Sequence, residues 1–358
     1  MTTYCRRCVT PSTRPRVKFD ADGICNACKW HERKLGINWK WPKLDLERIL
    51  SRFRGKGQWD MIVPLSGGKD SSTITHRMKY EFGMNPLTVS FANPLPTRIG
   101  LENLHNAVQT GFDNITITPN SADYRLYARR MFLEAGLPKQ PFVVGISTAV
   151  IRLAKAFGIK FVMYAEQGER EYGGDADSVH KFNRDFLTRI YYEGQDDCGQ
   201  YGPWWEVPTD ADLEDLHVTW MSEFVPWDPE ANARYAKDNC GMQMLVGGNI
   251  GTFSNYAQNE DKLQDLHTFL MYLKHGMGRC TSDASIEVRF GRMSREEGVN
   301  IVQMLDGQFP VEHLPAYLDY FEMTGEEFWA TCAKFVNNDL LIETNDISRP
   351  WVLRTPCV

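Results

Sequence analysis

The chain has 358 residues and a net charge of −6, with 42% hydrophobic and 24% charged residues, which is typical of a folded protein with ample core volume. No apolar run approaches the ~20 residues of a membrane span, and the N-terminus lacks a signal-peptide pattern, so we expect a cytoplasmic protein without a membrane partner. Residues 1–60 hold 14 Lys/Arg and 6 Asp/Glu, a charge of +8 that leaves −14 for the remaining residues. This basic segment could face an anionic substrate, RNA or the acidic body of its own chain.

Two cysteine pairs stand near the start of the chain. Cys5-x-x-Cys8 and Cys25-x-x-Cys28 are separated by 16 residues, a spacing that suits two knuckles closing on one Zn²⁺ through four thiolates. The spacer is too polar to fold on its own apolar content, so a metal would supply much of its folding free energy. Four cysteine ligands favour a closed, structural zinc site, and a redox pair or disulfide is the alternative.

We therefore assign residues 1–35 to a zinc-binding ribbon and residues 36–58 to a connecting helical segment. The amphipathic stretch from Trp30 to Arg54 is expected to be helical in its second half.

A glycine-rich turn follows. Residues 60–65 predict a strand, the string Ser66-Gly67-Gly68-Lys69-Asp70-Ser71 comes next, and residues 70–82 predict a helix. Adjacent glycines let successive amide groups converge on an anion at a helix N-terminus. The serines add hydroxyl donors, the lysine adds a charge, and the aspartate can hold Mg²⁺ against phosphate oxygens. The string is not a common P-loop and instead resembles the SGGxDS signature of PP-loop ATP pyrophosphatases, which cleave ATP to AMP and pyrophosphate; an ordinary glycine turn is the alternative.

Strands and helices alternate through the next part of the chain. The pattern predicts strands at 86–91, 114–118 and 159–165, and helices at 99–110, 121–135 and 142–157. Such alternation is typical of an α/β fold with a parallel, doubly wound sheet that helices cover on both faces. We expect residues 59–177 to form a PP-loop ATP-binding core.

Ligands of such sheets bind outside the carboxyl ends of the strands, near the point where the strand order reverses. Three loops should therefore share the ATP. They are Ser66–Ser71 after the first strand, Ser90–Asn93 after the second and Glu166–Gly174 after the fourth. Ser90 and Phe91 are expected to contact the adenosine, with a simple strand ending as the alternative.

From residue 178 onward the pattern changes to aromatic-rich, mostly helical segments. Helices are expected at 229–239, 261–275, 282–290, 295–306, 311–322 and 325–336, before an irregular end of about 20 residues. Ser294-x-x-Glu297 and Thr324-x-x-Glu327 have the form of capping boxes. Residues 178–358 are expected to pack on the core and to supply substrate and partner contacts.

Several strings in this order resemble the N-acetyl sugar amidotransferase family. They are CRRCV from Cys5, DGICNAC from Asp22, the glycine-rich turn, EREYGG from Glu169, DKLQDLH from Asp261 and LKHGMGR from Leu273. The matches run from about residue 4 to residue 300, and their order and spacing carry the resemblance.

The resemblance implies an ATP-dependent enzyme of surface-polysaccharide or flagellin sugar biosynthesis. Members convert the N-acetyl group of a nucleotide-activated sugar to an acetamidino group. The amide oxygen is adenylated with release of pyrophosphate, and ammonia then displaces AMP from the O-adenylyl imidate. A separate glutaminase is implied as the ammonia source, and this chain shows no nucleophile-elbow motif of its own. ATP, Mg²⁺ and structural Zn²⁺ are the implied cofactors, and no nucleic-acid partner is expected.

The loops and the resemblance together give the candidate site residues. The ATP-binding candidates are Ser66, Gly67, Gly68, Lys69, Asp70, Ser71, Ser90 and Phe91. The catalytic candidates are Lys69, Asp70, which is also the Mg²⁺ ligand, Glu166, Glu169, Lys274, His275 and Arg279. The substrate-binding candidates are Glu171, Tyr172, Lys262, Asp265 and His267. A solvated loop is the alternative for the residues between 166 and 172, and a salt-bridged helix surface is the alternative for those between 262 and 279.

Two other functions stay open. Some tRNA-thiolating PP-loop enzymes also join a cysteine-rich zinc module to an SGGxDS loop, and the basic first 60 residues agree with that function. The overall acidity and the absence of a clear catalytic-cysteine motif or a basic-aromatic surface oppose it. A non-catalytic ATP-binding scaffold for a polysaccharide assembly is less favoured, because the loop carries all six signature residues.

Overall fold

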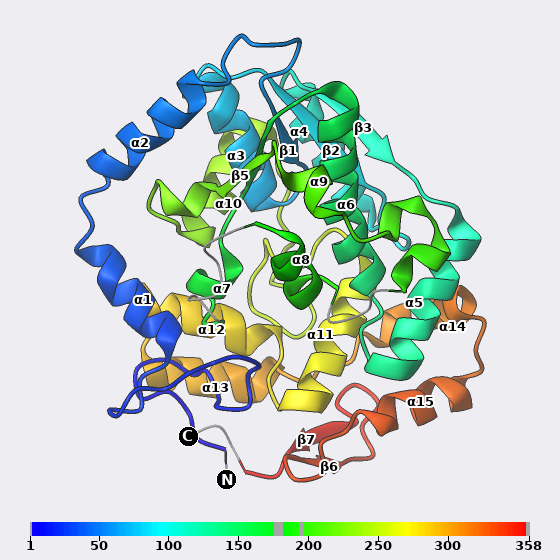
Figure 1. The fold of residues 1–358 in the computed structure, drawn as a ribbon. Coiled ribbons are helices and arrows are strands. Elements are labelled where there is room, and N and C mark those ends of the chain that lie inside the picture. Colours follow the sequence, from blue (N-terminus) through cyan, green and yellow to red (C-terminus); the bar gives the residue numbers. More distant parts are fainter. Residues whose placement is uncertain (1, 175–181, 193–196, 356–358) are drawn as a thin grey trace.

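The computed structural model describes residues 2–174, 182–192 and 197–355 and contains a five-stranded parallel sheet (Figure 1). The strands are β1 (Met61–Pro64), β2 (Pro86–Phe91), β3 (Asp113–Ile117), β4 (Phe161–Tyr164) and β5 (His217–Trp220). Their order is β3-β2-β1-β4-β5, and each neighbouring pair is parallel. Because the order reverses between β1 and β4, the loops after these two strands open into one crevice.

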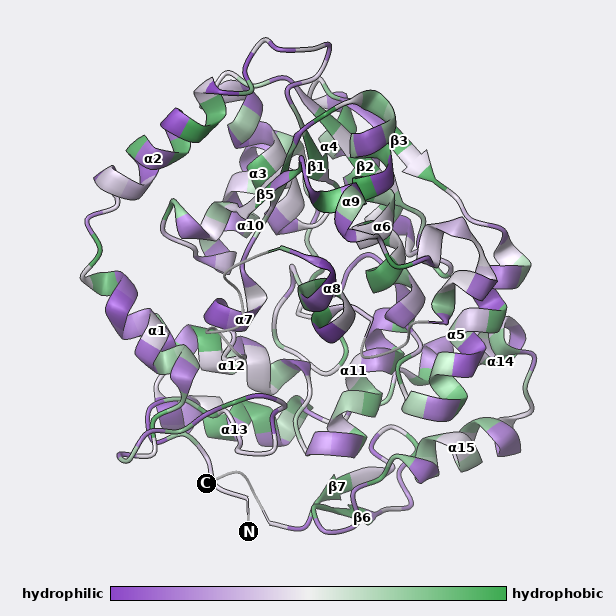
Figure 2. Ribbon diagram, in the orientation of Figure 1, coloured by the Kyte–Doolittle hydropathy of each residue, from purple (hydrophilic) through white to green (hydrophobic). Residues whose placement is uncertain are grey.

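Helices cover both faces of the sheet, because alternate strand residues point to opposite sides. On one face Ile62 and Val162 pack with α5 (Ser121–Ala135) and α6 (Gln140–Phe157). On the other face Val63 packs with α2 (Lys40–Ser51) and α3 (Lys69–Tyr80). Figure 2 shows the hydrophobic colouring of β1 between these layers. The expected doubly wound α/β fold is therefore confirmed.

A helical region with its own core lies beyond the carboxyl ends of the strands. The rings of Phe132 on α5 and of Phe321, Phe328 and Phe269 gather α11 (Lys262–His275), α14 (Leu314–Phe321) and α15 (Gly325–Lys334) into one cluster. A second cluster around Cys280 and Val302 joins α12 (Arg279–Arg289) to α13 (Arg295–Leu305), and α10 (Pro229–Cys240) packs on α3.

The remaining elements are short or peripheral. In the described ranges they are α1 (Asn26–Leu35), α4 (Arg98–Gln109), α7 (Gly168–Glu171), α8 (Arg184–Ile190), α9 (Asp210–Leu213), the 3-10 helices Cys198–Tyr201, Pro203–Trp205, Met221–Glu223 and Val311–His313, and the strands β6 (Leu341–Glu343) and β7 (Trp351–Leu353). None of the helices in the described ranges is long and apolar enough to cross a bilayer.

The predicted elements after the glycine-rich turn are confirmed, with their ends shifted by a few residues at most. Both capping boxes form, because the Ser294 and Thr324 hydroxyls accept from the amides of Glu297 and Glu327, whose carboxylates accept in return from the cap amides. These local signals need no distant partner, which is why the sequence predicts them well.

The second half of the stretch from Trp30 to Arg54 is helical as expected, because α2 covers Lys40–Ser51, and its first part is helical as well, because α1 extends to Leu35. Other predictions were wrong. The sheet takes a fifth strand, β5, from the part expected to be helical, and the irregular end contains the antiparallel pair β6 and β7. Residues 168–171 form a short helix inside the loop expected after β4. Strands of three or four residues give almost no periodic signal, so tertiary pairing decides them. The proposed domain borders stay predictions.

Gly145 on α6 offers a test of the packing between α6 and the sheet. A Cβ atom there would lie 2.2 Å from Cζ of Phe91, a ring that is only 4% exposed. We expect Gly145→Ala to lower the free energy of unfolding by about 1–3 kcal/mol, because the ring has no space to move into. Urea unfolding measures the change.

Gly325, the first residue of α15, is the matched control. A Cβ atom there meets nothing within 4 Å, so Gly325→Ala should be neutral or stabilising by up to about 1 kcal/mol. Equal free energies of unfolding for the two variants would contradict the close contact at Gly145.

Candidate active site

The turn between β1 and α3 is closed by its own serines. The Ser66 amide donates to Oγ of Ser71 at 3.2 Å, and the Gly68 amide donates to Oγ of Ser66 at 3.2 Å. Gly67 has a φ of +86°, and a Cβ atom there would lie 2.5 Å from the backbone nitrogen of Leu104, so this position requires glycine. The result is a tight glycine turn at the N-terminus of α3, at the crevice where the strand order reverses.

Asp70 is held from two sides. Its Oδ2 lies 2.6 Å from Nζ of Lys69, and its Oδ1 accepts a hydrogen bond of 2.9 Å from Nδ2 of Asn232 on α10. The Asn232 carbonyl in turn accepts from the hydroxyl of Thr73 at 2.9 Å. Asn232 therefore orients the carboxylate expected to bind Mg²⁺. No sequence pattern indicates this role, because only the packing of α10 against α3 creates it.

Glu166, the second residue after β4, comes close to this group. Burial raises the pKa of Glu166 to about 7, and the negative charge of Asp70 contributes to the shift. The Tyr172 hydroxyl donates to Oε1 of Glu166 at 3.2 Å. Asp70 and Glu166 are two carboxylates whose charges repel each other beside the glycine turn. Because Mg²⁺ prefers oxygen ligands and its charge offsets this repulsion, the two residues fit such an ion.

A cavity of about 180 Å³ joins these residues to the C-terminal region. Lys69, Glu166 and Tyr172 line one side of it, and Arg279 and Asp283 of α12 line another. Arg279 is paired with Asp283 through Nε and Oδ1 at 3.0 Å. The cavity thus brings together predicted residues from three separate segments, after β1, after β4 and on α12.

Tyr256, Arg14 and Glu287 line this cavity, and Glu260 lies beside the glycine turn; none of the four was expected from the sequence. Nζ of Lys69 lies 5.8 Å from the ring centre of Tyr256, in cation–π range. Glu260 lies over the turn, since a Cβ atom at Gly68 would be 2.3 Å from its Oε1. These positions come from distant segments, and no local pattern marks them.

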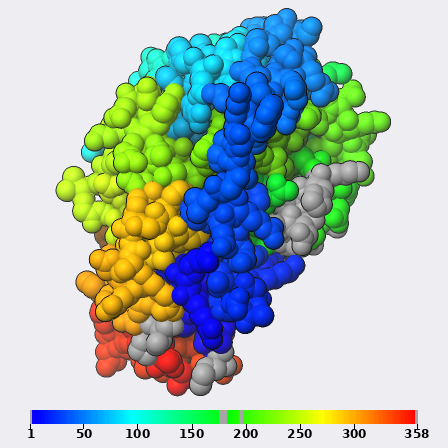
Figure 3. Space-filling view, turned by 90° about the vertical axis from the view of Figure 1, so that its left-hand side faces the viewer, coloured from blue at the N-terminus to red at the C-terminus, as the bar shows by residue number. Residues whose placement is uncertain are grey.

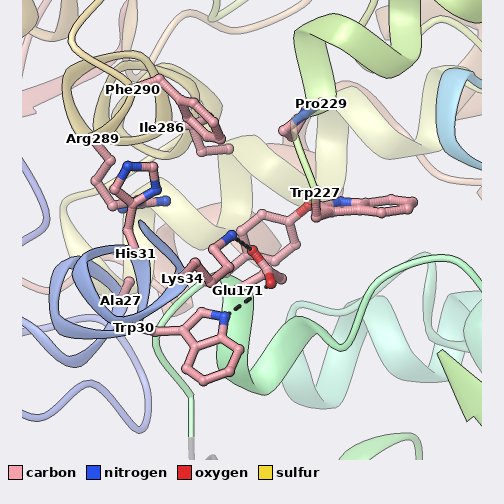
Figure 4. Close-up of a pocket in the computed structure, with 11 residues that line it drawn as sticks. Ala27, Trp30, His31, Lys34, Glu171, Trp227, Pro229, Ile286, Arg289 and Phe290 are labelled. Carbon is pink, nitrogen blue, oxygen red and sulfur yellow. Dashed lines mark hydrogen bonds and ion pairs between the residues drawn. The ribbon is translucent and has the colours of Figure 1, made fainter. Parts of the chain in front are cut away.

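Glu169 and Glu171 both bind the segment of residues 1–35, which contains the four cysteines and is called the cysteine module below. The Glu171 carboxylate accepts from Nε1 of Trp30 at 2.9 Å and from Nζ of Lys34 at 2.5 Å (Figure 4). The Glu169 carboxylate accepts two hydrogen bonds from Arg16, at 2.8 and 3.1 Å. The pocket drawn in Figure 4 holds only about 10 Å³, the space of one water-sized molecule. A catalytic role for Glu169 and a substrate role for Glu171 stay predictions.

Five predicted residues on α11 do not line this cavity in the described part of the chain. Nζ of Lys274 donates to the carbonyls of Ala135 and Gly136, and Asp265 pairs with His313 at 3.2 Å. Burial lowers the pKa of His267 to about 3 and that of His275 to about 4. The structure thus places Lys262, Asp265, His267, Lys274 and His275 in the packing of α11, and their expected roles stay predictions.

Ser90 and Phe91 at the end of β2 are nearly inaccessible. The Ser90 hydroxyl donates to the Leu65 carbonyl at 2.7 Å, and the Phe91 ring packs against α6. Their contact with adenosine stays a prediction.

The four cysteines form a compact, fully buried cluster. Their sulfur atoms lie within 4.8 Å of one another, with 3.9 Å between Cys5 and Cys28 and 3.7 Å between Cys8 and Cys25. A tetrahedral ion with metal–sulfur bonds of ~2.3 Å separates its sulfurs by about 3.8 Å. The expected metal site is therefore supported by the geometry, which fits one ion with four thiolate ligands.

The cysteine module packs against the C-terminal region. Nε of Arg295 donates to the carbonyls of Cys5 and Cys8, and Val9 packs in a cluster with Cys280 and Val302. Figure 3 shows the blue N-terminal residues against the orange segment that contains α13.

Comparison with known proteins supports the family expected from the motifs. Residues 250–355 match the C-terminal domain of WbpG-like LPS biosynthesis proteins, which confirms this expectation for the segment that carries Tyr256 and Arg279. The chain is also 26% identical over 161 residues to the uncharacterized protein MJ1599 of Methanocaldococcus jannaschii, a match that covers 44% of this chain and 57% of that protein. The chain thus spans less than two thirds of that relative.

Solved structures similar to this one include three of nucleotide- or tRNA-related proteins. NMN synthetase from Francisella tularensis has a TM-score of 0.36 and 11% identity, covering 73% of this chain and 96% of its own. A predicted tRNA methyltransferase subunit from Methanocaldococcus jannaschii has a TM-score of 0.31 and 14% identity, covering 59% and 85%. The U34-tRNA thiolase NcsA from Methanococcus maripaludis, with its 4Fe-4S cluster, has a TM-score of 0.29 and 11% identity, covering 81% and 87%.

The raised pKa of Glu166 predicts a pH-dependent loss of stability without nucleotide and Mg²⁺. Its pKa is about 7 in the folded protein and 4.5 ordinarily, so the folded state binds the extra proton between these values, and stability falls as pH rises through this window. Glu166→Gln should remove the effect. We expect this variant to match the wild type at pH near 4.5 and to exceed it by about 3 kcal/mol at pH near 8.

Urea unfolding at the two pH values measures this difference. Glu214→Gln, at an exposed position, is the control and should follow the wild type at both. If Glu166→Gln has no higher free energy of unfolding than the wild type at the higher pH, ionisation of Glu166 in the folded protein costs little free energy, which contradicts its raised pKa.

The cysteine cluster predicts a metal-dependent module. Cys25→Ser should abolish binding of one metal ion per chain and lower the thermal midpoint, because a single missing thiolate opens the tetrahedron. Metal content by mass spectrometry and thermal unfolding measure both effects. A metal-free wild-type protein with an unchanged midpoint would contradict this assignment.

Proposed function

We propose that this chain is an ATP-dependent amidotransferase. Its residues 250–355 match the C-terminal domain of WbpG-like LPS biosynthesis proteins. It converts the N-acetyl group of a nucleotide-activated sugar to an acetamidino group, in surface-polysaccharide or flagellin sugar biosynthesis, with ammonia from a separate glutaminase. The observation that carries this proposal is the shared cavity of Lys69, Glu166 and Arg279. It joins the SGGxDS-type turn and the β4 loop to the WbpG-like segment.

In the first step the amide oxygen of the N-acetyl group attacks the α-phosphorus of ATP. The bond between this phosphorus and the bridging oxygen breaks, and pyrophosphate leaves with the electron pair. Negative charge grows on the leaving group, where Lys69 and the amides of the glycine turn stabilise it. Asp70, oriented by Asn232, would hold Mg²⁺, which neutralises phosphate charge when bound.

In the second step ammonia attacks the imidate carbon. A carbon–nitrogen bond forms, the carbon–oxygen bond to the adenylyl group breaks, AMP leaves, and one proton of the ammonia is released. Glu166 lies in the same cavity with a pKa raised to about 7, which suits a group that accepts a proton at neutral pH. Residues of α12 and Arg14 of the cysteine module line the cavity, and this lining would limit the access of water to the imidate.

The metal of the cysteine cluster is zinc in this proposal. Four buried thiolates at tetrahedral spacing leave no open coordination position, and a closed site with four cysteine ligands is structural. Its ligands do not line the cavity of Lys69 and Glu166 in the described residues. The zinc therefore shapes the module and takes no part in the reaction.

The tRNA-thiolating alternative is less well supported by the cysteines. Apart from the cluster, the described cysteines Cys198, Cys240, Cys280 and Cys332 are buried, and burial raises the pKa of Cys240 to about 12. Such thiols are poor nucleophiles. Salt-dependent binding of bulk tRNA distinguishes the two functions and should be weak for this protein.

The decisive test is incubation of the protein with ATP, Mg²⁺, ammonium and a panel of N-acetyl sugar nucleotides. We expect AMP and pyrophosphate, together with one sugar nucleotide whose mass reports replacement of an oxygen by an NH group. Mass spectrometry of the sugar nucleotides and chromatography of the adenine nucleotides measure these products.

Asp70→Asn should abolish the turnover, because it removes the carboxylate charge beside the turn. Asp45→Asn, at an exposed position on α2, is the control with normal turnover expected. Formation of ADP in place of AMP would overturn the adenylation chemistry, and an unreactive panel with no AMP would favour a scaffold.

A further inference from the structure

The segment between the two cysteine pairs reaches from the metal cluster into the cavity. The hydroxyl of Thr13 donates to the carbonyl of His275 at the end of α11, at 2.6 Å. Three residues later, Arg16 donates two hydrogen bonds to Glu169 on α7. Arg16 also has a φ of 62°, a left-handed conformation that a non-glycine residue rarely adopts. Two anchors and a strained backbone thus fix the residues that lie between them.

Arg14 lies between these anchors and lines the cavity. In the described ranges its guanidinium has no hydrogen bond or ion pair, whereas the other two cations of the cavity have partners, Asp70 for Lys69 and Asp283 for Arg279. Arg14 is only partly exposed, and burial followed by the charge of Arg289 lowers its pKa. A partly buried arginine without a counter-ion is unusual, because buried charges are normally paired.

Arg14 and Lys69 both line the cavity but have different neighbours. Lys69 lies in the glycine turn and is paired with Asp70. Arg14 lies in the anchored segment, two residues before Arg16 and its partner Glu169. Arg14 thus offers an anion a cation separate from the one beside the phosphates that the glycine turn would hold.

We propose that Arg14, presented by the cysteine module, binds the diphosphate of the nucleotide-activated sugar and so positions the second substrate. The identity of that substrate rests on the proposed function. A guanidinium offers two parallel donors that match two phosphate oxygens. With the diphosphate at Arg14, the sugar extends toward Lys69 and Glu166, where its amide oxygen meets the α-phosphorus.

Binding measurements on the full chain with its metal test this assignment. Titration calorimetry with UDP or GDP as probes, in the presence of α,β-methylene-ATP, reports the diphosphate subsite without any turnover. Arg14→Ala should weaken binding of the probe by about ten- to a hundredfold. The affinity of Arg14→Ala for α,β-methylene-ATP should stay within about twofold of the wild type. The affinity of Arg14→Lys for the UDP or GDP probe should lie between those of the wild type and Arg14→Ala, because lysine keeps the positive charge but lacks the two parallel donors of the guanidinium.

Arg7→Ala is the matched control, because Arg7 belongs to the same module but is exposed and paired with Glu32. It should bind both ligands like the wild type. Metal content and circular dichroism of each variant establish that the module is folded.

Weakened ATP-analogue binding with unchanged probe binding would overturn the proposal, because it would place Arg14 at the triphosphate. A wild-type protein that binds neither UDP nor GDP, or an Arg14→Ala protein that binds them normally, would overturn it as well. Loss of probe binding in Arg14→Ala with no turnover of any N-acetyl sugar would refute the proposed reaction and leave the diphosphate subsite standing.

Discussion

The arrangement of the cavity depends on two ion pairs between the cysteine module and α7. Arg16 binds Glu169, and Lys34 binds Glu171, and the carboxylates of both pairs are more than nine-tenths buried. Removing one partner of the buried pair Lys34–Glu171 costs ~3–5 kcal/mol, because the other charge is left uncompensated, whereas the half-exposed Arg16 makes its pair with Glu169 the weaker one. The same short segment carries Glu166 and Tyr172, so the pairs tie the cysteine module to the loop after β4.

Three parts of the chain then meet at one cavity, each with a different contribution. The reversal of strand order brings Lys69 and Glu166 together at the ends of β1 and β4. The WbpG-like segment adds Arg279, and the cysteine module adds Arg14. In the proposed reaction, which has two anionic substrates and a water-sensitive intermediate, Lys69 and Arg14 would bind the two substrates from separate segments.

Much of this could be predicted where the signal is local. The glycine turn, the capping boxes at Ser294 and Thr324 and the spacing of the cysteine pairs each involve residues close in sequence. The strand β5 and the pair β6 and β7 could not be predicted, because strands this short acquire their stability from neighbours. Asn232 was missed for the same reason, since its amide serves Asp70 only through the packing of α10 on α3.

The sequence by itself determined the parallel α/β sheet, the phosphate-type turn after its first strand and a cluster of four cysteines, because backbone periodicity, glycine conformations and ligand spacing are properties of short stretches. Only the tertiary structure decided that Arg14 and Glu166, 152 positions apart in the numbering, share a cavity. It also decided that Glu169 and Glu171 bind the module and that Lys274 holds the end of α5. The physical reason is that a buried charged side chain pairs with a group on another segment, and the packing of distant elements decides which group lies beside it.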